Sequence, residues 1–279
     1  MSGERMGRLN GRAVPVSALV LPATERAARL GLGVFETALV TGGRAPLLSR
    51  HAARMDAGLR TLGLAPSRNI AERVHEGEAA IALAAIGEGV LRMIAAASPT
   101  EETEGFFAAW AEPRAGAAAR QEMTAITLAG GRRPGSPLAG VKALSYAEYD
   151  RAWQRARNRG CDEALLVDES GRLLEGARSN LFLVRGGALE TPALDSGILP
   201  GVVRGVVLEI ARGLGWTVRE TEIPGDALRS ASEAMLTNAL IGVASLVRVD
   251  GRPVGSGGAG PKAAQLRAEW TAALSRSHG

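Results

Sequence analysis

The residues that could do chemistry begin with a lysine that the composition sets apart. Of the 33 basic residues, only Lys142 and Lys262 are lysines, and all the others are arginines. Arginine replaces lysine where only charge matters, but a guanidinium does not lose its proton in proteins and cannot attack a carbonyl carbon. Lys142, which both tyrosines of the chain (Tyr146 and Tyr149) follow within seven residues, is therefore a candidate nucleophile. A surface lysine kept by chance is the alternative, and Lys262 fits that description.

Three further features are of the kind that bind a charged cofactor. Glu175 ends a predicted strand, where its carboxylate could pair with a protonated ring nitrogen. Gly201 opens a predicted helix, whose first backbone N–H groups, those of Val202 and Val203, can bind an anion such as phosphate. Arg54, on an earlier predicted helix, could neutralise the same phosphate. A lysine, a carboxylate and a phosphate site together describe pyridoxal 5′-phosphate (PLP), although each residue alone also fits an ordinary structural role.

The sequence around Lys142 also predicts a helix that follows it. Ser145 and Glu148 have the spacing of a capping box. In this motif the serine side chain accepts from the backbone N–H of the glutamate, and the glutamate side chain accepts from the backbone N–H of the serine. This pattern predicts a helix over residues 146–159. Lys142 would then lie just before the helix rather than within it.

Composition limits the class of protein. A chain of 279 residues, 46% hydrophobic and 22% charged, is that of a globular protein with a sizeable core, in one large domain or two smaller ones. The net charge is +4, but the arginines are scattered, which favours a small anionic substrate over nucleic acid. One cysteine and three distant histidines predict neither a disulfide nor a metal site. With no membrane-length apolar run and no signal peptide, the default expectation is a cytoplasmic protein.

Strand and helix patterns are mixed along the whole chain, which predicts the α/β or α+β class. The stretch 34–40, a turn at 41–44 and the stretch 45–48 together predict a hairpin. A Gly/Pro/Arg-rich stretch at 131–139 is either a linker or a substrate-facing loop. Read as a linker, it separates a smaller N-terminal domain (1–130) from a larger C-terminal domain (140–279). Further helices are predicted over 49–63, 69–86, 201–214 and 261–274, and strands over 90–97, 106–111, 123–128, 163–167, 173–175, 181–184, 188–191, 218–223, 234–237 and 246–249.

Short motifs spread over about residues 30–250 resemble those of the fold-type IV PLP enzymes, the class IV aminotransferase family. The family comprises branched-chain aminotransferases, D-amino-acid aminotransferases and 4-amino-4-deoxychorismate lyases. The resemblance implies two α/β lobes with PLP between them, and a homodimer. The motifs occur in the family's order, at residues 33–37, 51–55, 142–146, 162–166, 174–176, 179–182, 191–192, 197–204, 232–234 and 237–240.

The resemblance also implies roles for single residues. Lys142 matches the Schiff-base lysine, Glu175 the partner of the pyridine nitrogen, and Arg54 the phosphate-binding arginine. Tyr146 lies near the tyrosine that contacts the cofactor's O3′ in some members. Val203 departs from the pattern, since many members have threonine there, but a backbone N–H serves equally. The other phosphate-side residues are in the helix start and a second loop: Val202, Val203, Asn238 and Ala239.

Among the family's activities, three details favour the lyase, which eliminates pyruvate from 4-amino-4-deoxychorismate to give 4-aminobenzoate for folate synthesis. The stretch 238–240 is similar to the lyase loop, Thr37 stands where branched-chain aminotransferases carry glycine, and 142–147 looks like some bacterial lyases. Lys142 would remove the Cα proton and Thr37 would help to deliver a proton. Arg92 is either a contact for the substrate carboxylate or a strand-edge charge.

Two alternatives to the lyase stay open. An aminotransferase acting on a branched-chain or D-amino acid shares every cofactor residue and differs in requiring a 2-oxo acid. A PLP-binding protein without turnover would bind the cofactor but would give no spectral change with amino substrates. An intact Lys142 and Glu175 argue against this last reading.

Overall fold

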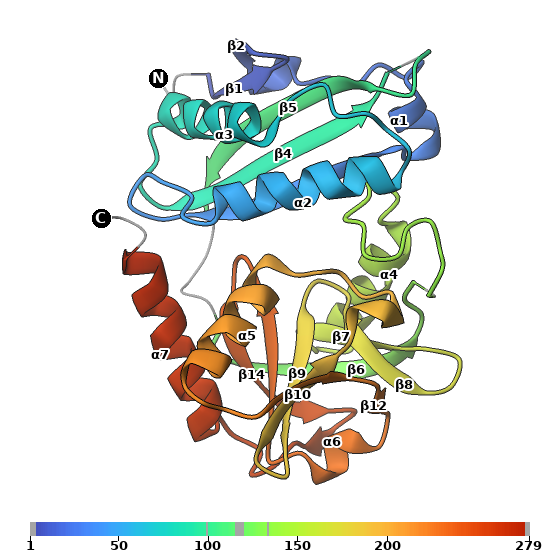
Figure 1. Cartoon of the computed structure of the whole chain (residues 1–279), viewed down its shortest axis with the longest axis vertical. Helices are drawn as coiled ribbons and strands as arrows, with labels where there is room; N and C mark the ends of the chain where they lie inside the picture. Colours follow the sequence, from blue (N-terminus) through green and yellow to red (C-terminus); the bar gives the residue numbers. More distant parts are fainter. Residues whose placement is uncertain (1–3, 99, 115–119, 133, 277–279) are drawn as a thin grey trace. The chain divides into compact units, whose positions relative to one another are not determined.

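The computed structural model describes residues 4–98, 100–114, 120–132 and 134–276. Contacts within the chain divide it into two units (Figure 1). Unit 1 comprises Met1–Gly116 and Val141–Ser145, and unit 2 comprises Ala117–Gly140 and Tyr146–Ser277. Both units mix helices with strands, as the sequence predicts. Arg133, within the predicted linker, lies outside the described residues.

Unit 1 is built on a five-stranded antiparallel sheet with the strand order β2–β1–β5–β4–β3. Along β3 the even-numbered positions from Val34 to Val40 are buried and the odd-numbered positions from Phe35 to Leu39 are half-buried. This alternation places one face of the sheet against two helices, α2 and α3 (Figure 1). The elements of unit 1 are β1 (Met6–Leu9), β2 (Arg12–Pro15), α1 (Arg26–Leu30), β3 (Gly33–Val40), α2 (Leu48–Thr61), α3 (Ile70–Ala84), β4 (Gly89–Ala97) and β5 (Glu104–Pro113).

The hairpin predicted for residues 34–48 is wrong. β3 pairs along its whole length with β4 instead, so that Thr37 lies opposite Arg92. Gly42 and Gly43, both with positive φ, make a tight turn closed by a single bridge between Thr41 and Arg44. The apolar residues after this turn enter α2 rather than a return strand.

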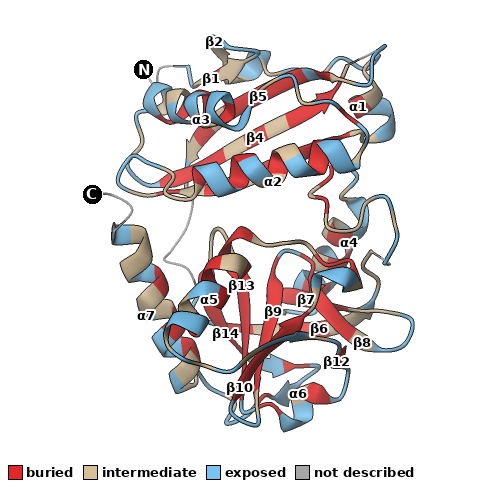
Figure 2. Cartoon of the chain, in the orientation of Figure 1, coloured by how far each residue is buried: buried red, intermediate tan, exposed pale blue. Residues whose placement is uncertain are grey.

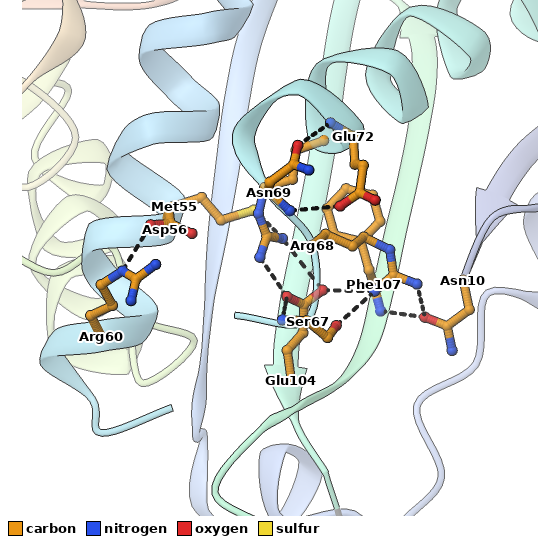
Figure 3. Close-up of polar contacts among 11 residues, drawn as sticks. Asn10, Met55, Asp56, Arg60, Ser67, Arg68, Asn69, Glu72, Glu104 and Phe107 are labelled. Atoms are coloured by element: carbon orange, nitrogen blue, oxygen red, sulfur yellow. Dashed lines mark hydrogen bonds and ion pairs between the residues drawn. The ribbon is translucent and has the colours of Figure 1, made fainter. Parts of the chain in front are cut away.

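A buried ion network ties α3 to the sheet in unit 1 (Figure 3). The guanidinium of Arg73 is fully buried and donates to both oxygens of Glu104 on β5. Arg68 donates to the same carboxylate at 2.9 Å, and the backbone N–H of Ser67 donates to it at 3.2 Å. Both guanidinium groups also lie over the ring of Phe107, at 5.3 and 5.4 Å from its centre. The carboxylate is thus compensated from several sides, as a buried charge requires.

Unit 2 is built on a ten-stranded sheet in the order β11–β10–β9–β13–β14–β6–β7–β8–β12, with β15 beside β14. The first and last strands of this order, β11 and β12, are separated in sequence by Glu222 alone. The sheet must therefore curl until its two edges approach each other. The strands are β6 (Glu122–Ala129), β7 (Glu163–Val167), β8 (Arg172–Gly176), β9 (Asn180–Arg185), β10 (Ala188–Pro192), β11 (Val218–Thr221), β12 (Ile223–Pro224), β13 (Glu233–Asn238), β14 (Gly242–Val249) and β15 (Arg252–Pro253).

The curled sheet encloses an aliphatic core, since the central strands are buried almost throughout (Figure 2). With few aromatic residues in the chain, this core consists of Ala, Val, Leu, Ile and one Met. The helices of unit 2 pack around the sheet: α4 (Ala147–Asn158), α5 (Val202–Gly213), α6 (Ala227–Ser230) and α7 (Pro261–Arg276). No helix among the described residues is long and apolar enough to cross a membrane.

The predicted helix after Lys142 exists as α4, but its predicted cap is wrong. Tyr146 is the N-cap residue and makes no side-chain cap bond. The hydroxyl of Ser145 donates instead to the carbonyl of Gly31, at 3.2 Å. The carboxylate of Glu148 accepts from the backbone N–H of Gly131, at 3.3 Å. Both side chains satisfy backbone groups that are distant in sequence, which the local spacing could not reveal.

Candidate active site

Lys142 lies on a short segment of unit 1 that pairs with β3. The N–H of Phe35 donates to the carbonyl of Lys142, and the N–H of Leu144 donates to the carbonyl of Gly33, each at 2.9 Å. The neighbouring Ala143 is fully buried, so the backbone of Lys142 is fixed on the sheet. Its Nζ lies 4.3 Å from the centre of the Phe35 ring, within cation–π distance. The segment therefore presents the amine at a defined place.

Glu36, His51 and Arg54 form a buried charged cluster in the same unit. Glu36 points from β3 towards α2, where Nδ1 of His51 lies 2.7 Å from one carboxylate oxygen. Arg54 donates to both carboxylate oxygens, through Nε and Nη2, at 2.7 Å each. Such a two-point contact fixes the plane of the guanidinium. Arg54, the predicted phosphate ligand, is therefore an oriented cation rather than a mobile surface charge.

The protonation states within this cluster follow from burial and charge. Burial alone would raise the pKa of Glu36, but the charge and hydrogen bonds of Arg54 and His51 lower it to about 2. Burial lowers the pKa of His51, and the nearby charges of Arg54 and Lys142 lower it further, against the opposing effect of Glu36. Histidine is then neutral and must carry its proton on Nδ1, because an ionised carboxylate can only accept.

Thr37 and Arg92, the two other predicted residues of unit 1, are brought together by the strand register. They are directly opposite each other on β3 and β4, so their side chains share the face of the sheet turned away from Glu36. Arg92 donates through Nε to the carboxylate of Glu112, at 2.6 Å. Arg92 thus has an ion-pair partner on the neighbouring strand β5, and its side chain is 41% exposed. A contact with a substrate carboxylate stays a prediction.

Glu175 is buried near the end of β8 in unit 2, and three donors hold its carboxylate. The hydroxyl of Tyr149 donates to Oε1 at 3.0 Å, and the N–H of Leu199 donates to Oε2 at 3.0 Å. The side-chain amide of Asn180 lies 3.4 Å from Oε2. Such donors favour the ionised carboxylate, the form that pairs with a protonated ring nitrogen. Sequence reasoning missed these three partners; Asn180 lay within a recognised motif and Tyr149 was noted only for its nearness to Lys142.

The start of α5 has the properties of an anion site. Gly201 is its N-cap and has no side chain to cap it. The first helical bond runs from Gly205 N–H to the Gly201 carbonyl, at 2.9 Å, so the N–H groups of Val202 and Val203 have no acceptor within the helix. Both valines are buried. A buried N–H requires an acceptor, and a phosphate group fits this requirement. A side chain at position 201 would force the Asn180 side chain to move, because its Cβ would lie 1.9 Å from Oδ1 of Asn180.

Asn238, predicted on the second phosphate-side loop, uses its side chain to build the turn that carries Ala239. Its Oδ1 accepts from the N–H groups of Leu240 and Ile241, each at 2.9 Å. Its amide donates to the carbonyl of Arg178, at 3.0 Å. The side chain thus shapes the loop, and any contact with an anion would come from the loop's backbone.

Tyr146 belongs to an aromatic pair in unit 2. Its ring stacks on that of Tyr149, with centres 4.9 Å apart and planes inclined by 14°. Its hydroxyl donates to the carbonyl of Ala177, at 2.7 Å. Burial, together with the charges of Glu175 and Glu163, raises the pKa of Tyr146 above its ordinary value. The phenol therefore stays protonated at neutral pH.

Glu163 on β7 is a second buried acid of unit 2, and it titrates near neutrality. Burial raises its pKa to about 7, although hydrogen bonds from the Ser179 side chain and from the N–H groups of Ala164 and Arg178 lower it. The Ser179 hydroxyl lies 2.8 Å from Oε2. The ordinary pKa is 4.5, so the folded protein holds this proton more tightly than the unfolded chain.

This difference predicts a fall in stability as the pH rises. The folded state binds more protons between pH 4.5 and about 7, so the free energy of unfolding decreases across that interval by about 3 kcal/mol. Glu163→Gln does not titrate and is expected to remove this part of the pH dependence. Urea unfolding of both proteins at pH 5 and pH 8 measures it. An identical loss of stability in the wild type and the variant would contradict the assignment.

Comparisons with known proteins identify the family to which this fold belongs. The family model described as amino-transferase class IV matches residues 33–249. The T.th. branched-chain amino acid aminotransferase with pyridoxamine 5′-phosphate is 26% identical, with a TM-score of 0.88, over 98% of this chain and 95% of that one. The structure of the T.th. enzyme with N-(5′-phosphopyridoxyl)-L-glutamate has a TM-score of 0.89, with 25% identity and the same coverage.

Curated relatives also carry the name branched-chain-amino-acid aminotransferase. The protein of Salmonella typhimurium is 35% identical over 125 residues, which cover 45% of this chain and 40% of the relative. The protein of Pseudomonas aeruginosa is 34% identical over 123 residues, which cover 44% of this chain and 40% of the relative. The matches thus span less than half of the length of these relatives. The family and fold predicted from the motifs are confirmed, whereas the named relatives are aminotransferases rather than lyases. The chain belongs to the class IV aminotransferases, and its cofactor is PLP.

Proposed function

We propose that this protein is an aminotransferase that moves an amino group between a branched-chain amino acid and a 2-oxo acid. The observation that carries the proposal is the similarity to the T.th. enzyme over almost the whole chain, at 26% identity. The structure with a phosphopyridoxyl-glutamate adduct supports glutamate as one amino partner. This reading replaces the lyase as the leading function.

The residues of unit 1 supply the reactive amine and an oriented cation. PLP, when bound, supplies an electron sink that stabilises negative charge at the substrate's α-carbon. Lys142 would hold the cofactor's aldehyde and, once released by the substrate amine, would move the proton at that carbon. Arg54, fixed by Glu36, would neutralise phosphate.

The residues of unit 2 would hold the ring and the phosphate. Glu175, whose carboxylate accepts hydrogen bonds from Tyr149 and Leu199, would keep a proton on the ring nitrogen. The N–H groups of Val202 and Val203 at the start of α5 would bind phosphate oxygens, with the backbone of Ala239 on the second loop. Tyr146 would contact the ring's hydroxyl, as the resemblance implies.

The lyase remains a second candidate because of one specific arrangement. Thr37 lies directly opposite Arg92, on the face of the sheet in unit 1 that is turned away from Glu36. A hydroxyl beside a cation could deliver a proton to the leaving group while the cation binds a carboxylate. This is the residue pair that the lyase reading requires. It is weaker support than the relatives, because Arg92 already pairs with Glu112.

A two-substrate assay separates the candidates. The holoenzyme is mixed with L-leucine, L-isoleucine or L-valine and 2-oxoglutarate, with a D-amino acid and 2-oxoglutarate, and with 4-amino-4-deoxychorismate alone. We expect glutamate to form with the branched-chain substrates and only when the oxo acid is present. Formation of 4-aminobenzoate and pyruvate without any oxo acid would establish the lyase instead. Cofactor binding without a spectral change on adding any amino substrate would indicate a binding protein.

A further inference from the structure

We propose that Tyr149 is a positioning residue of the cofactor site, acting through a hydrogen bond that orients and stabilises the carboxylate of Glu175. This inference rests on the proposed role of Glu175 as the partner of the ring nitrogen. Tyr149 is not among the residues that the family resemblance assigns, and it is known so far only as one of the donors to Glu175. It contributes a side-chain donor from α4 to an acid on β8.

The contact is made between two buried side chains. Tyr149 and Glu175 are each 5% exposed, and the phenol hydroxyl lies 3.0 Å from Oε1. The other two donors, Leu199 N–H and the Asn180 amide, are both on Oε2. Tyr149 thus donates to the opposite oxygen, so the carboxylate is held at both of its oxygens. Hydrogen bonds to a buried charged group are among the stronger ones in proteins.

Tyr149 is itself held in place, which allows it to orient another group. Its ring stacks on Tyr146, whose hydroxyl is bonded to the carbonyl of Ala177. The guanidinium of Arg132 also lies over the Tyr149 ring, 5.2 Å from its centre. Ala177 is two residues beyond Glu175, so the tyrosine pair fastens the start of α4 to the end of β8 at two neighbouring points.

The phenol can act only as a donor to this carboxylate. Burial raises the pKa of Tyr149, and the negative charge of Glu175 raises it further. The hydroxyl therefore stays protonated over the whole working range, and its proton points at Glu175. Removing the Tyr149 hydroxyl would stabilise the ionised form of Glu175 less. The pKa of Glu175 would then rise, and the carboxylate would compete more strongly with the ring nitrogen for its proton.

The test is Tyr149→Phe, which removes the hydroxyl and keeps the ring. We expect the dissociation constant for PLP, measured by absorbance titration of the apoprotein, to rise roughly tenfold. The visible absorbance band of the bound cofactor should also shift, because its ring nitrogen is less firmly protonated. An unchanged dissociation constant and an unchanged band would overturn the proposal.

A double-mutant cycle shows whether the effect passes through Glu175. In a Glu175→Gln background, Tyr149→Phe should change neither the affinity for PLP nor the band. If it has the same effect in both backgrounds, Tyr149 acts independently and the positioning role is wrong. If Glu175→Gln alone leaves the affinity for PLP and its absorbance band unchanged, the proposed role of Glu175 itself is wrong. This outcome distinguishes a failure of the proposed function from a failure of the positioning role of Tyr149.

Thr191→Val serves as the matched control. Thr191 is fully buried on β10 of the same unit, and its hydroxyl donates to the carbonyl of Leu181, at 2.8 Å. Its loss removes one buried hydroxyl bond, as Tyr149→Phe does, and should lower thermal stability by a comparable amount. The affinity for PLP and the absorbance band should not move. A Thr191→Val protein that reproduces the Tyr149→Phe changes would reduce them to general destabilisation.

Discussion

Lys142→Arg is expected to abolish turnover, with a loss of at least roughly a thousandfold. Arginine keeps the positive charge and much of the length of the side chain, so it can still lie over the Phe35 ring. It cannot lose its proton, and so can neither hold the cofactor's aldehyde nor move the proton at the substrate's α-carbon. The measurements are the turnover with the best amino donor and the visible absorbance of the purified protein.

Lys262→Arg is the matched control, since it makes the same change at the only other lysine. Lys262 lies at the start of α7 with its Nζ 3.7 Å from the centre of the Trp216 ring, a contact that arginine retains. Activity and absorbance should equal those of the wild type. Substantial turnover by the Lys142→Arg protein would refute the role of Lys142 and with it the proposed chemistry.

Glu104→Ala is expected to cost about 3–5 kcal/mol of the free energy of unfolding, the largest stability effect predicted for a single side chain here. The substitution leaves the fully buried guanidinium of Arg73 without its carboxylate partner. Arg68, which Figure 3 shows beside Glu104, loses the same acceptor. A buried charge without compensation is far more costly than the pair itself. Denaturant unfolding followed by circular dichroism measures the loss.

Glu102→Ala is the control for the loss of a glutamate in the same part of unit 1. Glu102 is 72% exposed and pairs with Arg26 at 3.2 Å, so its removal should change stability by no more than about 0.5 kcal/mol. Replacing the whole pair, with Arg73→Met and Glu104→Leu together, should cost less than Glu104→Ala alone, because no charge stays buried. If the double variant is the less stable of the two, packing rather than charge governs this site.

Local pattern was sufficient for most secondary structure. The run that became α5 has apolar residues with a period of about 3.6, because one face of that helix is buried. The run that became β4 is a short, almost continuous apolar stretch, which is typical of a strand buried on both faces. The prediction of a hairpin after β3 was wrong because a turn sequence indicates that the chain reverses but does not indicate which strand will pair with β3. The prediction of a capping box before α4 was wrong because the hydroxyl of Ser145 donates to the carbonyl of Gly31, more than a hundred residues away in sequence.

In the candidate site too, some residues could be predicted from the sequence, whereas the contacts that hold them could not. Lys142 stood out by composition, and the motifs around Glu175 and Arg54 resembled a known family. The cluster that orients Arg54 did not stand out, since Glu36 precedes it by 18 residues and only the packing of α2 on β3 joins them. The contact between Tyr149 and Glu175 likewise depends on the packing of α4, which places the Tyr149 hydroxyl beside the Glu175 carboxylate.

By itself the sequence determined the class of fold and the family, and it predicted residues whose chemistry a PLP enzyme needs, because these depend on residue type, spacing and order. Tertiary structure alone decided which groups hold those residues in place and in which protonation state. Burial and hydrogen bonding set the ionisation of Glu36, His51 and Glu163, and both arise from contacts between segments distant in the chain. A local pattern carries no information about such contacts.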